Sequence, residues 1–314
     1  MPTLSLGSGN NALDFSEFFK VKVDGVSQSG NFKGYLFDGG AGTDVMRIHD
    51  NWSTSHFSLS TTGNGVVTLT CSSGAMTFTN FETLQFDNVT IKLGTAANDT
   101  ITGSSSSDTF LYGLAGNDRI DGGLGSDKMF GGFGNDTYTV GSLSDAVTEY
   151  AGEGTNDTIK SSISYSLIDT DGAGANGGNV ENLTLTGTGN NYATGNALNN
   201  KITGNSGGNF ITGGLGRDIM KGGAGADTFD FNAIAETSKL AAQRDIIKDF
   251  LVGTDTIDLA TIDANGGAAG DTFIWLGTGA FTGVAGQLHY TTTATMTLFR
   301  ETSMATRSPT SKLP

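Results

Sequence analysis

Aspartate recurs at a fixed interval in the middle of this 314-residue chain. Over residues 113–139, three nine-residue units follow one another without a gap. Each has glycine at positions one and four, aspartate at position six and a large side chain at position eight. Two carboxylates brought close together repel each other unless a cation lies between them. Oxygen ligands from a flexible loop suit Ca²⁺, which takes 6–8 of them, so the spacing predicts several bound calcium ions.

The same spacing predicts the elements that hold these carboxylates. The glycines allow a tight turn with positive φ, and the last three residues of each unit form a short strand whose middle side chain points inward. Two units then make one coil, and coils stack at ~4.8 Å, the usual distance between neighbouring strands. Turns two units apart therefore meet, which places Asp118 beside both Asp99 and Asp136. The expected fold is all-β, a parallel β-roll or β-solenoid.

The first repeat block covers residues 94–140. Its five units are spaced 9, 10, 9 and 9 residues apart, so we interpret Tyr112 as a one-residue insertion and place Phe110 at an inward position eight. We expect Asp108 to lie near Asp127. The candidate metal-binding residues of this block are Asp99, Asp108, Gly113, Gly116, Asp118, Gly122, Gly125, Asp127, Gly131, Gly134 and Asp136.

The second repeat block covers residues 186–231 and carries amides where the first has carboxylates. An asparagine side chain offers a carbonyl oxygen but no charge, so we expect weaker or fewer ions here, or an asparagine ladder that is purely structural. Asp218 and Asp227 are the best ligands of the block. Its candidate metal-binding residues are Asn200, Asn209, Gly213, Gly216, Asp218, Gly222, Gly225 and Asp227.

The remaining segments also have a β pattern. Alternating apolar residues before the first block predict antiparallel strands, and the segment between the blocks contains an echo of the repeat at residues 155–159. We divide the chain into six segments. They are an N-terminal β-rich region (1–93), a first roll block (94–140), a β spacer (141–185), a second roll block (186–231), a β-rich C-terminal cap (232–300) and an aberrant tail (301–314).

Composition narrows the function classes. The formal charge of −15 disfavours nucleic acid as a partner. Cys71 is alone, so no disulfide joins two parts of the chain. No apolar run approaches the ~18 residues of a membrane span, and the N-terminus lacks the basic and apolar regions of a cleavable signal peptide. These features alone would indicate a cytosolic protein.

The repeats resemble the hemolysin-type calcium-binding repeats of the RTX (repeats-in-toxin) family. The segments GGAGADTFDF, DIIKDFLVGTDTIDL and FTGVAGQLHY are similar to the C-terminal β-roll domain of serralysin-type metalloproteases. The resemblance implies export by a type I secretion apparatus through an uncleaved C-terminal signal. It also implies folding outside the cell, where calcium is plentiful, and so predicts an extracellular protein.

The last 14 residues depart from this family. Members often end in a glycine- and aspartate-rich segment, whereas this chain ends in ETSMATRSPTSKLP. Back-translation of residues 300–312, read from the third base of each codon, permits the sequence G-D-V-D-G-D-A-V-A-D-F-E-I. We therefore hypothesise that this tail is out of frame, which the coding DNA would settle.

The sequence contains no motif that indicates a catalytic centre. The zinc motif H-E-x-x-H is absent, and the G-x-S-x-G match at residues 204–208 lies in phase within the repeat, without a strand and helix around it. We predict a non-enzymatic structural or interaction protein, acting in surface assembly, adhesion or host contact. Two alternatives stay open: a non-catalytic C-terminal module of a secreted protease, lipase or polysaccharide epimerase, and a β-roll that binds extracellular carbohydrate.

Overall fold

The computed structural model describes residues 90–104, 109–168, 177–236 and 241–262 continuously, and elsewhere the strands named below with residues 276 and 282. Asp108 and the tail beyond Glu301 lie outside the described residues. The chain divides into two units, residues 1–186 and 187–314. The described residues contain no α-helix, only strands and two short 3-10 helices.

The N-terminal part of unit 1 is built from short strands in both pairing modes. β7, β8 and β9 form an antiparallel meander, and β3 pairs antiparallel with β4. In contrast, β1 pairs parallel with β5, and β2 and β10 pair parallel with β6. These strands are β1 (Thr3–Ser5), β2 (Ala12–Phe15), β3 (Lys20–Val23), β4 (Val26–Ser29), β5 (Leu36–Asp38), β6 (Val45–Ile48), β7 (Phe57–Thr61), β8 (Val66–Cys71), β9 (Gly74–Thr79) and β10 (Thr83–Phe86).

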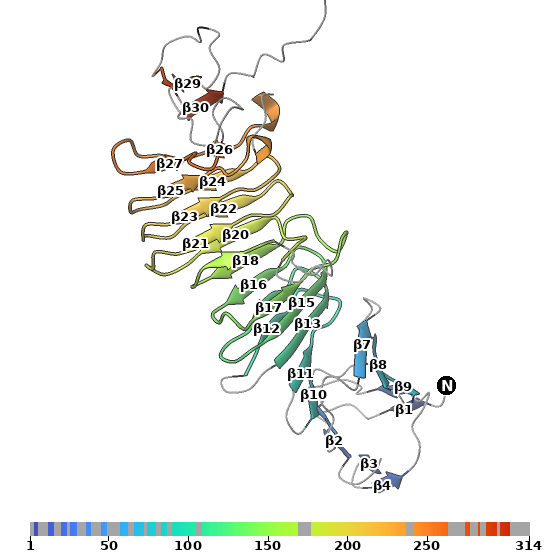
Figure 1. Cartoon of the computed structure of the whole chain (residues 1–314). Coiled ribbons are helices and arrows are strands. Elements are labelled where there is room, and N and C mark those ends of the chain that lie inside the picture. Colours follow the sequence, from blue (N-terminus) through green and yellow to red (C-terminus); the bar gives the residue numbers. More distant parts are fainter. Residues whose placement is uncertain are drawn as a thin grey trace, which may run out of the picture. The chain divides into compact units, whose positions relative to one another are not determined.

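The rest of unit 1 is a parallel β-roll, in which successive strands alternate between two sheets (Figure 1). One sheet has the order β17-β15-β13-β11 and the other β12-β14-β16-β18-β20, so each strand pairs with the strand one coil away. The strands are β11 (Thr90–Leu93), β12 (Thr100–Thr102), β13 (Thr109–Ala115), β14 (Arg119–Asp121), β15 (Lys128–Phe133), β16 (Thr137–Val140), β17 (Ala146–Thr148), β18 (Thr158–Ser161), β19 (Tyr165–Ser166) and β20 (Asn182–Leu185).

Unit 2 repeats the architecture, with sheet orders β21-β23-β25-β27 and β22-β24-β26. The parallel stacking continues beyond the last nonapeptide, because β26 pairs with β24 and β27 with β25. The elements are β21 (Tyr192–Thr194), β22 (Lys201–Thr203), β23 (Phe210–Thr212), β24 (Ile219–Lys221), β25 (Thr228–Asp230), η2 (Ile234–Glu236), η3 (Ala241–Gln243), β26 (Ile246–Ile247), β27 (Thr256–Asp258), β28 (Ile274–Trp275), β29 (Gln287–Thr293) and β30 (Met296–Glu301).

Position eight of the repeat forms the core of both rolls. In unit 1 the middle residues of β12, β14, β16, β18 and β20 pair in register and are buried, and they are Ile101, Ile120, Tyr138, Ile159 and Leu183. In unit 2, Ile202 pairs with Met220, and Ile211 pairs with Phe229. Each fully buried side chain of this size contributes roughly 1.5–3 kcal/mol. The predicted all-β parallel roll and its inward position eight are thus confirmed.

One inward position differs from the prediction. Phe110 is half-buried, and its neighbour Leu111 is fully buried and pairs with Met129. The extra residue of this unit therefore lies before Thr109, not at Tyr112. The prediction for Phe110 was wrong because the spacing shows that one residue is inserted but not where the chain accommodates it.

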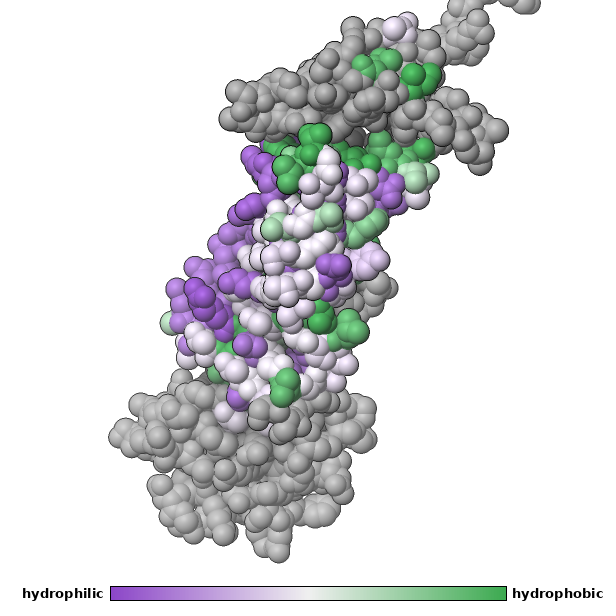
Figure 2. Space-filling view, turned by 90° about the vertical axis from the view of Figure 1, so that its left-hand side faces the viewer, coloured by the Kyte–Doolittle hydropathy of each residue, from purple (hydrophilic) through white to green (hydrophobic). Residues whose placement is uncertain are grey.

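Polar residues dominate the outside of the rolls. On the face drawn in Figure 2, hydrophilic and near-neutral residues make up most of the coloured surface. The exposed large apolar side chains include Leu124, Phe133 and Leu215, which occupy position three of their turns. Among the described residues, no helix has the length and apolar character needed to cross a membrane.

Candidate metal centre

The position-six side chains form a ladder of hydrogen bonds along the turns of unit 1. The backbone N–H of Asp99 donates to Oδ1 of Asp118 at 2.8 Å, and that of Asp118 donates to Oδ1 of Asp136 at 2.7 Å. The N–H of Asp136 donates in turn to Oδ1 of Asp157 at 2.7 Å. Each carboxylate is therefore held by the backbone of the preceding coil, and the predicted meeting of Asp118 with Asp99 and Asp136 is found.

Unit 2 has the same ladder, extended by residues outside the repeat. The N–H groups of Asn200 and Asn209 donate to Oδ1 of Asp218 and of Asp227, at 2.7 and 2.8 Å. Those of Asp218 and Asp227 donate to Oδ1 of Asp245 and of Asp255, at 2.8 and 3.0 Å. Asp245 and Asp255 thus take the position-six place in a further coil.

The second oxygen of several of these carboxylates is buried without a hydrogen bond. Oδ2 has no hydrogen-bond partner in a set of five aspartates, none of them more than 1% exposed: Asp118, Asp136, Asp157, Asp218 and Asp227. A buried polar atom left unpaired costs about 1–3 kcal/mol, and more when it is charged. Such a recurrent set calls for a partner, which is either a proton on each carboxyl group or a shared cation.

Carboxylate and carbonyl oxygens meet beside the first glycine of the turn. A Cβ on Gly113 would overlap Oδ2 of Asp118 and would lie 2.6 Å from the carbonyl oxygen of Gly131, one coil further on. Glycine is therefore required at position one because oxygen atoms occupy the space that a side chain would fill. At position four, Gly116 and Gly134 have φ of 116° and 134°, a region that other residues rarely adopt.

The turns are of two kinds, which differ at position two. In one kind, the residue at position two has a left-handed backbone, with φ from 79° to 102°, and Oδ2 of the position-six aspartate has no hydrogen-bond partner. The position-two residues are Leu114, Gly132, Gly214 and Gly223, in the turns of Asp118, Asp136, Asp218 and Asp227. In the other kind, the position-two N–H donates to the turn's own position-six side chain. These pairs include Thr95 with Asp99, Asn196 with Asn200, and Asn205 with Asn209, at 2.7, 2.8 and 2.8 Å. Ser104 with Thr109 and Ser142 with Asp145 show the same hydrogen bond, at 3.2 and 3.0 Å.

This difference sorts the predicted ligands. Three side-chain oxygens already accept hydrogen bonds within their own turns: Oδ1 of Asn200, Oδ1 of Asn209 and Oδ2 of Asp99. These three side chains therefore fit a structural role. Asp118, Asp136, Asp218 and Asp227 each keep one buried oxygen without a partner. Sequence reasoning did not separate the two kinds of turn, and the residue type at position two does not separate them by itself, because Leu114 takes the left-handed conformation in the turn of Asp118.

Asp108 was predicted to be the position-six ligand of its unit. The N–H that donates to Oδ1 of Asp127 belongs to Thr109, at 2.8 Å, so Thr109 stands at position six of this coil. The displacement follows from the inserted residue, which lies before Thr109. Asp127 itself is buried, and its N–H donates to Oδ1 of Asp145 at 3.1 Å.

Burial dominates the electrostatics of the turns. It raises the pKa of Asp118 to about 6, and those of Asp136 and Asp218 to about 7. The backbone hydrogen bond of the ladder opposes this increase in each case, and neighbouring carboxylates add to it. The charged form of these groups is therefore unfavourable near neutral pH unless a positive charge accompanies it.

The residues present fit a calcium ion. All donors at the turns are carboxylate or carbonyl oxygens on short, glycine-containing loops, which is the ligand set that Ca²⁺ prefers. Histidine and cysteine, the ligands that favour transition metals, are absent from the described turns of both rolls. A divalent cation would also supply the missing partner of the unpaired Oδ2 atoms.

One cluster was not predicted from the sequence. Asp136, Glu149 and Asp157 are all buried, and one carboxylate oxygen from each lies within 4.8 Å of the other two. Burial raises the pKa of Glu149 to about 9, a hydrogen bond from Tyr138 opposes this increase, and the charges of Asp157 and Asp136 add to it. Glu149 belongs to no nonapeptide, so the repeat spacing gave no reason to place it at the turns.

The fold and the turns define a class of protein, the parallel β-rolls with acidic glycine-rich turns. Residues 59–303 match the family model described as Peptidase M10 serralysin C terminal, and the chain belongs to this family. The resemblance predicted from the repeats and the C-terminal segments is thereby confirmed. The matched domain is the non-catalytic C-terminal β-roll of serralysin-type proteins, and RTX β-rolls of this kind generally bind Ca²⁺.

Other comparisons add little. The crystal structure of extracellular lipase LipA from Serratia marcescens is similar at 13% sequence identity, with a TM-score of 0.15. The match covers 59% of this chain and 31% of the lipase chain. Among curated protein sequences, none matches this chain.

Proposed function

We propose that this chain is a secreted calcium-binding protein whose two rolls fold when Ca²⁺ binds at their turns. The observation that carries the proposal is the set of buried Oδ2 atoms without a partner in both rolls. Without a cation, each roll must bury several carboxyl groups that are either charged and unpaired or protonated. With calcium, the same atoms become ligands, so the ion favours the folded state over the unfolded state.

The ions would be held by the turns in which position two is left-handed. In unit 1 these turns supply Asp118, Asp127 and Asp136, and in unit 2 they supply Asp218 and Asp227. The glycines at positions one and four keep the space around the ion open and shape the loop, at Gly113, Gly116, Gly122, Gly125, Gly131, Gly134, Gly213, Gly216, Gly222 and Gly225. Bound calcium supplies positive charge and a coordination shell that cross-links successive coils.

We further propose that the protein acts outside the cell as a structural or interaction protein and reaches it through a type I secretion apparatus. A chain that stays unfolded at low intracellular calcium can be exported unfolded and then fold where calcium is abundant. The alternative is that the chain is the non-catalytic C-terminal module of a secreted enzyme, which the match to a domain from the C-terminal part of peptidases favours.

Limited proteolysis tests the folding part of this proposal. We expect the two rolls to resist trypsin in millimolar calcium and to be degraded in chelator, with cleavage at Lys and Arg residues inside the rolls, such as Arg119 and Lys201. Resistance in chelator would contradict it. Export is tested by expressing the chain in a host with and without a type I apparatus, and a longer reading frame that encodes a catalytic domain would favour the enzyme module.

A further inference from the structure

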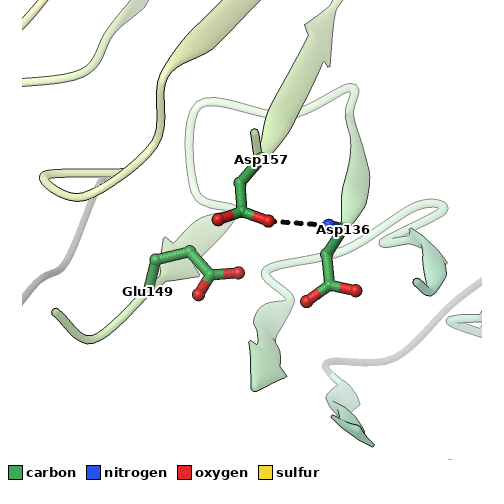
Figure 3. Close-up of side chains that lie close together, drawn as sticks. All are labelled: Asp136, Glu149 and Asp157. Atoms are coloured by element: carbon green, nitrogen blue, oxygen red, sulfur yellow. Dashed lines mark hydrogen bonds between the residues drawn. The ribbon is translucent and has the colours of Figure 1, made fainter. Parts of the chain in front are cut away.

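Three buried carboxylates converge where the nonapeptide repeat of unit 1 is interrupted (Figure 3). Asp136 ends the last regular turn before β16, Glu149 follows β17, and Asp157 precedes β18. Figure 3 shows their carboxyl groups facing a common space. One oxygen from each group lies within 4.8 Å of the others.

The parallel register explains why Glu149 enters this space. In the pairing of β15 with β17, the last pair is Phe130 with Thr148. The next residues, Gly131 and Glu149, are therefore equivalent positions of successive coils, and Gly131 is the first glycine of the turn that carries Asp136. A Cβ at Gly131 would overlap Oδ2 of Asp136 and would lie 2.6 Å from Oε1 of Glu149. Where the repeats have glycine at position one, this coil therefore has a carboxylate. The Glu149 backbone is held by a hydrogen bond from Nδ2 of Asn179 to its carbonyl oxygen at 2.8 Å.

Each of the three carboxylates has one oxygen held by the protein and one left over. Oδ1 of Asp136 accepts from the N–H of Asp118, and Oδ1 of Asp157 accepts from the N–H of Asp136, both at 2.7 Å. Oε1 of Glu149 accepts from the hydroxyl of Tyr138. The other oxygens, Oδ2 of Asp136, Oδ2 of Asp157 and Oε2 of Glu149, are buried and have no hydrogen-bond partner.

Protonation alone does not resolve this arrangement. A proton on Glu149 would remove one negative charge but would leave Oδ2 of Asp136 and Oδ2 of Asp157 buried and unpaired. A single cation among the three groups would compensate the charges of all three carboxylates and could bind an oxygen from each. Ca²⁺ binds oxygen at 2.3–2.6 Å, so two oxygens on one ion are at most about 5 Å apart. The separation within 4.8 Å satisfies this limit.

We propose that Asp136, Asp157 and Glu149 bind one calcium ion together, that Glu149 is a ligand of this ion from outside the nonapeptide repeat, and that Tyr138 is the positioning residue of Glu149. This inference rests on the proposed function, because it assumes that calcium accompanies folding. It gives the ion at Asp136 three carboxylate ligands, where the other described repeat turns provide one or two. The ion would join the enlarged turn at residues 150–156 to the last regular turn and so keep the coil continuous across the break.

Calcium counting on the full chain tests the site. Equilibrium dialysis with radioactive calcium should show one ion fewer per folded chain for Glu149→Gln than for the wild type. Glutamine keeps the size of the side chain and an oxygen that can accept from Tyr138, so mainly the charge is lost. The matched control is Glu153→Gln, which removes the same charge from the same turn outside the cluster, and it should bind the wild-type number of ions.

A second variant, studied by terbium luminescence, tests the site independently in case Glu149→Gln does not fold. The Tyr138 hydroxyl contacts Glu149, so Tb³⁺ in this site should be excited efficiently by Tyr138. Tyr138→Phe should lower the tyrosine-sensitised Tb³⁺ emission at saturation and weaken calcium binding at this site about tenfold, as loss of a residue that orients a ligand typically does. Tyr192→Phe, which changes an exposed tyrosine of unit 2, should leave the emission unchanged.

The outcomes separate this inference from the proposed function. If Glu149→Gln binds as many ions as Glu153→Gln with the same affinity, or if Tyr138→Phe does not alter Tb³⁺ emission, the site is overturned while calcium-dependent folding stands. If the wild-type chain itself binds no calcium, the proposed function fails and the site with it.

Discussion

The backbone N–H of Asp118 donates to Oδ1 of Asp136 at 2.7 Å, while Oδ2 of Asp136 is buried without a partner. One oxygen of the carboxylate therefore stabilises the stacking of coils, and the other is available to an ion. This division of roles means that a position-six aspartate can lose its ion without losing its place in the ladder. It also means that an amide can replace the carboxylate in the ladder but not in the ion site.

Replacing Asp118 by Asn should separate the two roles. Asparagine can still accept the hydrogen bond from the N–H of Asp99, but it loses the charge that a calcium ion requires. We expect Asp118→Asn to shift the calcium midpoint of folding upward about tenfold. An ion present at 100 times its dissociation constant adds about 2.7 kcal/mol, which sets the scale of the stability lost in calcium.

The control for this substitution is Asp99→Asn. Oδ2 of Asp99 already accepts hydrogen bonds from the N–H and hydroxyl of Thr95, at 2.7 and 2.8 Å. Its calcium midpoint should therefore stay close to that of the wild type. Equal shifts for the two variants would contradict the division of turns into two kinds.

Gly113→Ala tests the space beside position one. The added methyl group would overlap Oδ2 of Asp118, so we expect a loss of about 1–3 kcal/mol in the free energy of unfolding, measured with urea in calcium. Gly141→Ala is the control, because the closest atom to its Cβ would be the carbonyl oxygen of Gly123 at 3.8 Å. A change within about 0.5 kcal/mol is expected there. A neutral Gly113→Ala would show that no oxygen occupies this space.

Stability should depend on pH in opposite ways with and without calcium. The pKa values of Asp118, Asp136 and Asp218 are raised in the folded state to about 6, 7 and 7, above the ordinary value near 3.9. The folded chain without calcium thus binds more protons than the unfolded chain. Its stability is greatest below pH ~4 and is lost as the pH rises through 6 to 7.

Calcium competes with those protons, so its affinity should rise over the same pH range. The folded fraction in calcium-free buffer at pH 4.5 and 7.5, measured by circular dichroism, together with calcium midpoints at pH 5.5 and 7.5, checks both trends. A calcium-free folded fraction that increases between pH 5 and 7 would contradict the burial of these carboxyl groups.

A closed turn of unit 2 should be convertible into an ion site. In the turn that begins at Gly204, the N–H of Asn205 donates to Oδ1 of Asn209, so this side-chain oxygen is already engaged within its own turn. The double substitution Asn205→Gly and Asn209→Asp restores glycine at position two and a carboxylate at position six. We expect one additional calcium ion per chain by equilibrium dialysis, and no additional ion with Asn205→Gly alone. An unchanged count in the double variant would mean that position two does not control the site.

The period of the repeat was sufficient to predict the parallel roll, because only one arrangement of nine-residue units buries position eight and stacks the turns. It could not locate the inserted residue near Phe110, because several positions satisfy the same spacing and only packing against Met129 selects Leu111. It also could not find Glu149, since this residue reaches the turns through the register of β15 and β17 and not through the repeat.

The ladder itself was only half predicted. The spacing brought Asp118 and Asp136 together, but like charges in contact suggested an ion as their only link. The structure adds a backbone hydrogen bond that no residue type reveals, because every residue has an N–H. At position five the side-chain oxygen of Asn117 accepts from the N–H of Asn135 at 2.7 Å, which explains the polar residue there.

Circular dichroism during a calcium titration tests the central claim most directly. In chelator we expect a chain that is mainly unfolded or without fixed packing, and in calcium a β-rich, heat-resistant protein. The transition should fall near 10⁻⁴–10⁻³ M, the range of extracellular calcium modules. Magnesium should substitute poorly, because it requires a smaller octahedral arrangement. Identical spectra with and without chelator would contradict the claim that calcium binding drives this fold.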